Sequence, residues 1–589
     1  MAPGCPRTLS ICRNGIFEDE TNHSPTPGIL RRIVMGYTPE MKELIKRVEA
    51  TRPARVERAR RGENFPALSL EERAVVLEKF HPDYQKEGRR AVRVGRDKGL
   101  VLPDEIATML ESRSMLRPDK VDLTKIDFDT DVLIVGAGGG GSSAALLASN
   151  SGLKVIMATK LRHGDANTMM AEGGIQAATQ ECDSPFYHYL DTIGGGHFTN
   201  QPDLVAALAH DAPLSIAWLE SLGMIFNKLP DGRLDARHFG GSSRKRMNSS
   251  GDMTGAEIMR VLRDEVRNRR DRITVLEFCP AVELLLDETG KCAGAILYNM
   301  ETREFFIARA KAVVIATGGN GRLHIKGFAT TNHYGATMDG VVMCYRAGVG
   351  TTCLPSTQYH PTGVAYPEQN VGLLITEKVR GLGAHVLNNE GEQFCFPLEP
   401  RDVESAELIK EAVEVQKAVL TPTGRYGLWL DSPMIDLLHG EGTVRRELPA
   451  KFIQFARHGI DISKEPMLVY PTLHYQNGGI AINADCETVI PGLYSAGECT
   501  GGVHGENRLM GNSLQDVITF GRRAGVSAAA YVKKGVELKK LTLDHVAGYE
   551  KELAEAGIDN PMVAPILLPD YATDEVASRR MAEAIQEAE

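Results

Sequence analysis

The stretch Asp131-Val132-Leu133-Ile134-Val135-Gly136-Ala137-Gly138-Gly139-Gly140-Gly141 decides the fold of this 589-residue chain. Residues 132–135 predict a buried strand, the glycines predict a tight turn, and the small residues 142–149 predict a helix. A second strand, expected over residues 154–157, completes a strand–turn–helix–strand unit. Such a turn lets a pyrophosphate approach backbone N–H groups at the helix N-terminus. The sequence therefore predicts an α/β dinucleotide-binding domain with Gly136, Gly138 and Gly141 at the cofactor.

Other glycine-rich segments recur after this unit. Residues 171–175 and 316–319 each contain paired glycines, and the second pair ends an apolar strand at 312–315. Thr159 stands where a ribose-binding acid is expected at the end of the second strand. Only one segment has a convincing dinucleotide-binding motif, so we expect no separate site for NADH or NADPH.

A second group of motifs carries polar side chains suited to anions. The runs Gln358-Tyr359-His360-Pro361-Thr362-Gly363 and Thr376-Glu377-Lys378-Val379-Arg380-Gly381 precede an isolated His474 and Arg508. Arginine and imidazole groups bind carboxylates by charge-assisted or bidentate hydrogen bonds. The set predicts a site for a small dicarboxylate. Glu377 and Arg380 would share one face of a helical turn, where they could exchange a proton.

Together these segments resemble the flavoprotein subunits of the succinate dehydrogenase and fumarate reductase family, which includes L-aspartate oxidase. The resemblance covers residues 129–525, about two-thirds of the chain. It implies FAD as cofactor, with residues 171–175 beneath the isoalloxazine and Glu498 on the ribose hydroxyls. The other FAD-binding positions, besides the three motif glycines, are Thr159, Lys160, Asn167, Thr168, Gly173, Gly174, Asp339, Ser513 and Leu514.

The resemblance also assigns the chemistry. It implies that His360, Thr376, His474 and Arg508 bind the substrate, and that flavin N5 delivers a hydride to it. Arg401 is the implied proton donor, although its pKa above about 12 requires immediate reprotonation. Glu377 and Arg380 would lead the proton in from solvent. One residue of the family motif differs: Leu382 stands where the usual Arg-Gly-Glu-Gly sequence has glutamate.

The expected fold class is α/β. A Rossmann-like FAD-binding domain carries an inserted α+β capping domain, with a helical N-terminal extension and a short helical C-terminal tail. The capping domain is expected to close over the substrate and exclude water. The predicted boundaries are 1–128 for the extension, 129–361 and 469–530 for the FAD-binding domain, 362–468 for the capping domain and 531–589 for the tail.

The first 128 residues match no motif of that family. Helical periodicity is present at Pro39–Val48 and Ser69–Phe80, and Ser69 is placed to cap the second helix. We interpret this segment as a charged helical appendage rather than as part of the catalytic machinery.

The composition limits the classes of partner that we expect this chain to bind. A net charge of −10 gives no reason to expect nucleic-acid binding. No segment offers the roughly 20 apolar residues of a membrane span, so we expect a cytoplasmic protein that reaches the membrane face only through partners. The ten cysteines are scattered singly, which predicts neither a metal site nor an iron–sulfur cluster held by this chain alone. A contribution of Cys5 and Cys12 to a shared site stays open.

An iron–sulfur subunit is therefore the expected partner, with a membrane anchor or larger redox complex as a further one. The FAD is expected to be non-covalent. In the family a histidine often attaches it, and Asn167 takes that position here. An amide nitrogen is not a usable nucleophile toward the flavin. His163, four residues earlier, is the only nearby substitute, and it is too far along an ordered loop.

The leading hypothesis is a flavoprotein subunit of a fumarate reductase or succinate dehydrogenase, acting in electron transport during anaerobic respiration. The alternatives are an L-aspartate oxidase and a flavin subunit that only relays electrons within a larger complex. Gly511 before Asn512 is closer to the dehydrogenase pattern than to the oxidase. The substrate-binding set argues against a mere relay, which would not need it.

Overall fold

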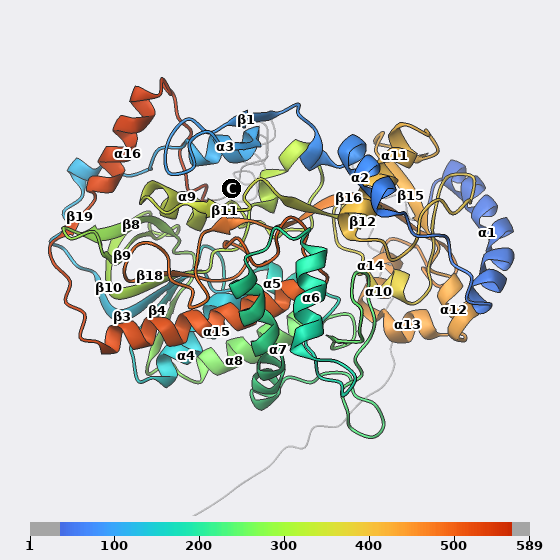
Figure 1. Cartoon of the computed structure of the whole chain (residues 1–589), viewed down its shortest axis with the longest axis horizontal. Helices are drawn as coiled ribbons and strands as arrows, with labels where there is room; N and C mark the ends of the chain where they lie inside the picture. Colours follow the sequence, from blue (N-terminus) through green and yellow to red (C-terminus); the bar gives the residue numbers. More distant parts are fainter. Residues whose placement is uncertain (1–35, 568–589) are drawn as a thin grey trace, which may run out of the picture.

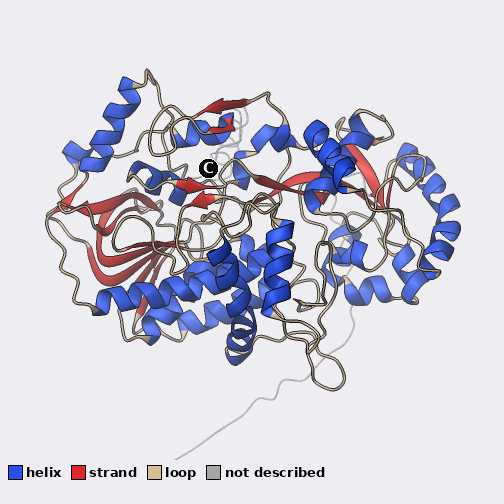
Figure 2. Ribbon diagram, in the orientation of Figure 1, coloured by secondary structure: helices blue, strands red, loops and turns tan. Residues whose placement is uncertain are grey.

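A computed structural model of the chain describes residues 36–567, so the predictions for Cys5, Cys12 and residues 568–589 lie outside the described residues. The chain forms two lobes that lie side by side (Figures 1 and 2). One lobe is built on a large mixed sheet and the other on a smaller antiparallel sheet. The predicted α/β fold class is confirmed.

The large sheet has the strand order β19-β8-β9-β10-β3-β4-β7, and β18 also pairs with β10. Strand β3 pairs in parallel with β10 and β4, and β4 pairs in parallel with β7. The strands are β3 (Phe128–Val135), β4 (Val155–Ala158), β7 (Ile273–Leu276), β8 (Ala281–Asp287), β9 (Cys292–Tyr298), β10 (Phe305–Ile315), β18 (Leu493–Ser495) and β19 (Leu541–Thr542). Residues 132–135 of β3 and 155–158 of β4 are continuously apolar because both faces of the sheet are covered there.

The helices that pack on this lobe include α4 (Gly139–Asn150), α7 (Pro202–Ser221), α8 (Thr254–Arg267) and α15 (Asn512–Lys533). The predicted helix after the glycine turn is confirmed as α4, which begins earlier than expected because Gly139–Gly141 form its first turn. Helix α15 runs across α4 (Figure 1). A Cβ at Gly521 would lie 2.5 Å from the Gly140 carbonyl oxygen, so the two helices meet backbone to backbone.

The smaller sheet has the order β12-β16-β15-β13, with β14 beside β15. Its strands are β12 (Thr357–Tyr366), β13 (Val386–Leu387), β14 (Val419–Leu420), β15 (Tyr426–Leu430) and β16 (Met467–Gln476). Its helices are α10 (Lys378–Gly381), α11 (Arg401–Val413), α12 (Met434–His439), α13 (Thr443–Glu447) and α14 (Pro449–Ala456). The predicted domain boundaries at 361 and 469 fall inside β12 and β16, so these two strands connect the lobes. The boundaries themselves stay a prediction.

The N-terminal segment contains both expected helices, α1 (Pro39–Arg60) and α2 (Leu70–Phe80). Ser69 caps α2 as predicted: its hydroxyl accepts from the Glu72 N–H at 3.2 Å, and the Glu72 carboxylate accepts from the Ser69 N–H at 2.8 Å. The segment also contains a hairpin that was not predicted, β1 (Arg89–Ala91) and β2 (Val101–Pro103), followed by α3 (Asp104–Leu110).

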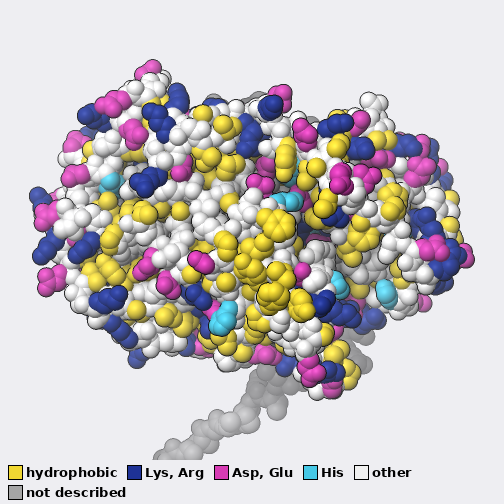
Figure 3. Space-filling view, in the orientation of Figure 1, with side chains coloured by type: hydrophobic (Ala, Val, Ile, Leu, Met, Phe, Trp, Pro, Cys, Tyr) yellow, Lys and Arg dark blue, Asp and Glu magenta, His cyan; other side chains and the backbone are white. Residues whose placement is uncertain are grey.

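The remaining elements are α5 (Asn167–Met170), α6 (Pro185–Gly195), α9 (Asp339–Arg346), α16 (Asp544–Glu555), β5 (Ile175–Gln176), β6 (Met247–Asn248), β11 (Thr351–Thr352) and β17 (Gly479–Ile480). The described part of the tail thus contributes β19 to the large sheet as well as α16. On the face shown in Figure 3, charged side chains of both signs are mixed, and apolar side chains gather where α6 lies. Within residues 36–567, no helix has the length and apolar character needed to cross a membrane.

Candidate active site

The glycine turn after β3 lines the smaller of two adjoining cavities, with a volume of about 90 Å³. Gly136 has φ +107°, and a Cβ there would lie 2.2 Å from the Ala316 carbonyl oxygen, so only glycine fits. Gly138 also lines the cavity, at the N-terminus of α4. Gly141 lines neither cavity. A Cβ at Gly141 would lie 1.9 Å from the Gly136 carbonyl oxygen, so this glycine lets the helix approach the turn.

Three other predicted cofactor residues line the same cavity: Thr159, Lys160 and Asp339. The Lys160 ammonium lies 2.6 Å from the Asp339 carboxylate and 2.6 Å from the Thr337 hydroxyl. Both charged side chains are nearly buried. The pair fixes Lys160 at the end of β4, where the chain offers polar groups to a bound nucleotide.

The larger cavity has a volume of about 330 Å³ and shares Asn167, Thr168, Glu498 and Val517 with the smaller one. Gly173 and Gly174 line it, together with Ser513 and Leu514 from the first turn of α15. A helix N-terminus presents free N–H groups and the positive end of the helix dipole to electron-rich atoms. The connected cavities suit an extended cofactor, with its pyrophosphate at the glycine turn and its ring system in the larger space.

Asn167 lies at the junction of the two cavities, and its amide is fully hydrogen-bonded. Its Nδ2 donates to Glu498 Oε2 at 3.0 Å and to Asn332 Oδ1 at 2.5 Å, while its Oδ1 accepts from the His333 N–H at 2.9 Å. His163 lines neither cavity. Its Nε2 lies 3.0 Å from the Ser142 hydroxyl on α4, which turns the ring away from the cofactor space.

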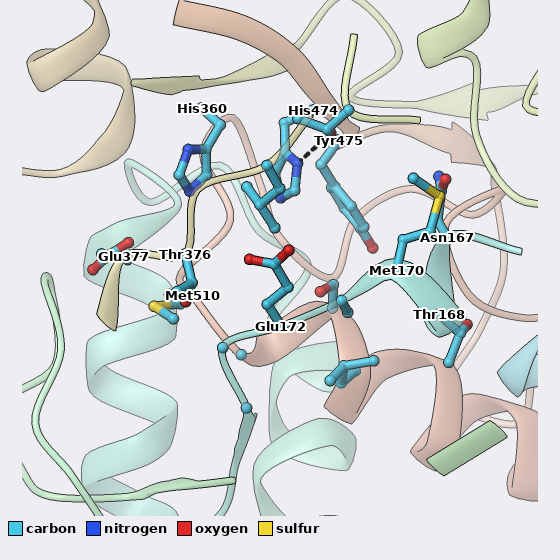
Figure 4. Close-up of a pocket in the computed structure, with 18 of the residues that line it drawn as sticks. Asn167, Thr168, Met170, Glu172, His360, Thr376, Glu377, His474, Tyr475 and Met510 are labelled. Carbon is cyan, nitrogen blue, oxygen red and sulfur yellow. Dashed lines mark hydrogen bonds between the residues drawn. The ribbon is translucent and has the colours of Figure 1, made fainter. Parts of the chain in front are cut away.

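The four predicted substrate-binding residues, His360, Thr376, His474 and Arg508, all line the larger cavity. His360 on β12 and His474 on β16 come together because these strands pair, and their ring centroids are 5.0 Å apart (Figure 4). Burial, followed by the nearby Arg401 charge, lowers the pKa of both imidazoles well below its usual value. Both rings are therefore neutral at physiological pH.

The ring nitrogens show how these histidines are oriented. The Nδ1 atom of His360 accepts from the Thr362 N–H at 3.2 Å, which leaves a hydrogen on Nε2. That Nε2 atom is buried and has no partner among the described residues. His474 Nδ1 lies 2.7 Å from the Thr331 hydroxyl. An unpartnered buried donor next to a cavity is costly unless a ligand accepts its hydrogen bond.

Arg508 and Arg401 both line the larger cavity, and Gln358 connects them. The Gln358 Oε1 atom accepts from Arg508 Nη2 at 2.8 Å and from Arg401 Nη1 at 3.1 Å. Arg508 also lies over the Tyr475 ring, with its guanidinium carbon 4.6 Å from the centroid. Burial lowers the pKa of Arg508 to about 9, so it stays charged near neutral pH. Its hydrogen bonds go to amide and carbonyl oxygens, and within residues 36–567 no carboxylate lies within ion-pair distance of it.

The predicted proton-donor group is also assembled. Arg401 is the first residue of α11, and its Nε donates to Glu377 Oε2 at 3.2 Å. Arg380 Nη2 lies 3.6 Å from the same Glu377 oxygen and pairs on its other side with Glu404. Arg401 and Glu377 line the cavity, whereas Arg380 lies buried behind them. The three residues form a continuous line of ionisable groups that ends in the cavity.

Three residues were missed as site residues. Gln358 stands two residues before His360, so strand periodicity places both on one face of β12, although nothing in the sequence indicated its bridging role.

Glu172 lines the cavity beside the paired glycines (Figure 4). Lys451 of α14 lies 2.6 Å from it, which links the two lobes at the cavity edge. Burial raises the pKa of Glu172 to about 7.

Known proteins share much of this sequence and fold. The model of the FAD binding domain family matches residues 131–514. One of the subunits of the CoM/CoB fumarate reductase of Methanothermobacter marburgensis is 38% identical over 407 residues, covering 68% of this chain and 73% of the relative. An L-aspartate oxidase of Nostoc sp. is 38% identical over 417 residues, 69% of each chain. A mutant quinol fumarate reductase of E. coli matches with a TM-score of 0.65 and 32% identity, covering 73% of this chain and 74% of that one.

Proposed function

The chain belongs to the family of FAD-dependent oxidoreductases that contains the flavoprotein subunits of fumarate reductases and succinate dehydrogenases, and we propose that it interconverts fumarate and succinate. FAD is its cofactor. The absence of a covalent FAD attachment would favour the reduction of fumarate, or of a closely related unsaturated dicarboxylate.

The observation that carries this proposal is the buried Arg508 beside neutral His360 and His474. Arg508 donates only to protein carbonyl and amide oxygens among the described residues, so its charge is not neutralised. A buried cation is strongly destabilising unless an anion pairs with it. The larger cavity adds the unpartnered Nε2 of His360. A dicarboxylate supplies two anionic groups, one for the arginine and one for the imidazole side.

The chain's own residues bind the substrate and deliver the proton. When bound, FAD supplies the hydride for one alkene carbon from its reduced N5. Arg508, His474, His360 and Thr376 hold the carboxylates, so that negative charge developing on the other carbon is stabilised. Arg401 transfers a proton from its guanidinium to that carbon. Glu377, 3.2 Å from Arg401 Nε, restores the proton, and Arg380 connects Glu377 to the groups behind it. The sum is one hydride and one proton added across the double bond.

The first test is a steady-state assay of the FAD-loaded protein under anaerobic conditions with a reduced viologen dye. Dye oxidation that depends on fumarate and yields an equal amount of succinate supports the proposal. Aspartate consumption in air, with peroxide and an imino acid as products, would instead assign the L-aspartate oxidase reaction, which one 38% identical relative carries in its name. If neither reaction occurs, both enzymatic assignments fail and the electron relay is the alternative to test next.

We further propose that an iron–sulfur protein supplies the electrons. Several relatives are named as subunits, which supports the presence of other subunits. Within residues 36–567, no group of three His, Cys, Asp or Glu side chains is placed to hold a metal ion. Isolation of the complex from its native source is expected to recover a cluster-containing partner. A membrane anchor is expected only if that partner binds one. A purified single chain that reduces fumarate with NADH would contradict this assignment.

A further inference from the structure

The N-terminal segment lies on both lobes of the enzyme. Helix α1 packs in the smaller lobe beside α12, where Arg52 and Arg55 bind Asp431 at 2.8 and 2.7 Å. After α2, the hairpin and α3 contribute Leu102 and Ile106 to the core of the large lobe. From α1, at the far side of the smaller lobe, the described part of this segment crosses to the larger lobe, where β1 and α3 lie (Figure 1). Helix α2 is therefore held between two anchored ends.

Helix α2 packs directly against α11, the helix that begins with Arg401. Val76 and Leu77 of α2 form a small buried core with Val403 and Ala406 of α11. Both α11 residues lie within its first two turns. Contact at this end of the helix acts on the turn that carries the Arg401 side chain.

Polar contacts fix the residues immediately before Arg401. The Glu399 side chain is fully buried, and its Oε1 accepts from the Leu68 N–H at 2.7 Å. Its Oε2 lies 2.7 Å from Nη2 of Arg73, on α2. Two contacts from one segment thus hold a carboxylate two residues from the proton donor. A buried carboxylate that loses its cation is strongly destabilised. The Glu399 carboxylate is therefore held where it can pair with Arg73.

The turn after α2 reaches the strand that carries the other half of the site. The His81 ring lies edge-on against Tyr359 of β12, with ring centroids 5.5 Å apart. The Asp83 carboxylate accepts from the Thr357 N–H at 2.7 Å. Gln358 and His360 are the neighbours of these contact points. Residues 68–84 therefore contact both α11, which carries Arg401, and β12, which carries Gln358.

We propose that residues 68–84 form a clamp that positions Arg401 for proton transfer, and that Arg73 is a positioning residue of the enzyme, acting through Glu399. The inference rests on the proposed function, in which Arg401 is the proton donor. Misplacement of a reacting group by about 1 Å can reduce the rate by about 10²-fold. Residues 68–84 thus take part in catalysis without touching the substrate.

The test compares three variants of the full chain loaded with FAD. Arg73→Met removes the cation, Arg73→Lys retains it, and Arg61→Met is the control, because Arg61 forms only exposed ion pairs with Glu57 and Glu63 on the same segment. For Arg73→Met, kcat for fumarate should fall about 10-fold or more, with KM within about twofold. The solvent isotope effect on kcat should rise, because proton transfer becomes slower. Arg73→Lys should recover part of the rate.

Hydrogen exchange of residues 401–405 gives a readout that does not depend on turnover. Arg73→Met should accelerate it and Arg61→Met should not. An unchanged isotope effect, or unchanged exchange at 401–405, would overturn the clamp, as would a rate loss matched by an equal loss of bound FAD. If the parent chain does not reduce fumarate, the proposed function fails, while the exchange data still decide whether Arg73 fixes the start of α11.

Discussion

The Nε atom of Arg401 donates a hydrogen bond to Oε2 of Glu377 at 3.2 Å, and both side chains are buried at the wall of the larger cavity. Burial lowers the pKa of Arg401, and the Glu377 charge opposes this effect. An arginine in this setting can lose a proton to a substrate only if a neighbouring acid returns it. Glu377 is the group placed to do so.

Replacing Arg401 by Gln tests this role. We expect FAD to stay bound and fumarate affinity to change by less than about an order of magnitude. Turnover should fall by at least about 10²-fold, the lower end for the loss of a general acid. The comparison is Arg380→Gln, which removes a residue that does not line the cavity. If Arg380→Gln were far more damaging, the two arginines would have to exchange roles.

Replacing Gln358 by Met tests its bridging position. The amide oxygen is shared by two arginines, and hydrogen bonds to charged groups contribute about 1.5–3 kcal/mol. We expect kcat/KM for fumarate to fall about 10- to 100-fold, at constant FAD content. Gln358→Glu should be worse, because its carboxylate would compete with the substrate for Arg508. Gln85→Met, outside the site, is the control, and equal kcat/KM in Gln358→Met and the control would show that the bridge does not matter for the reaction.

The mode of FAD attachment can be tested by acid precipitation of the purified protein. Yellow flavin is expected in the supernatant, because the Asn167 amide is not a nucleophile and His163 is directed toward Ser142. A pellet that keeps flavin fluorescence would contradict this prediction. The variant His163→Gln then decides whether that histidine forms the bond, since loss of the fluorescence would identify it.

Glu407 on α11 predicts a pH dependence of stability. Burial raises the pKa of its carboxyl from 4.5 to about 8, with Glu399 acting in the same direction and Lys410 and Arg73 opposing it. The folded chain therefore holds this proton when the unfolded chain has lost it. The resulting stabilisation is complete below about pH 4.5 and is lost as the pH rises toward 8.

The variant Glu407→Gln mimics the protonated carboxyl at every pH. It should match the parent in urea unfolding at low pH and exceed it near pH 8, by on the order of 1–3 kcal/mol in the free energy of unfolding. The measurement is the urea midpoint at both pH values. If the urea midpoints of the two proteins differed by the same amount at both pH values, the proton on Glu407 would not contribute to stability.

The sequence was sufficient for features that depend on local chemistry. Gly136 has a positive φ and no room for a Cβ, which would lie 2.2 Å from the Ala316 carbonyl oxygen, so this position requires glycine. Ser69 and Glu72 likewise cap α2 within three residues. His360 and His474 were expected to share a site because of family resemblance, and the pairing of β12 with β16 brings their rings together.

Contacts between distant segments could not be predicted in this way. Leu68 and Glu399 are 331 residues apart, and neither has an unusual local sequence. The bridging role of Gln358 depends on where the two arginine side chains lie, which follows from packing of α11 against β12. Lys451 reaches Glu172 only because α14 lies over the cavity. These three features depend on tertiary packing, which the residue pattern of a single segment does not reveal.

The proposed reaction is the transfer of a hydride and a proton to a dicarboxylate alkene bound in this cavity. It is tested most directly by mixing the anaerobic protein, with its FAD reduced chemically and excess reductant removed, with fumarate. We predict that the absorbance of oxidised flavin returns, that one succinate forms per FAD, and that Arg401→Gln slows this single turnover by at least about 10²-fold. Flavin that stays reduced in the presence of fumarate but is reoxidised by oxygen would contradict the claim.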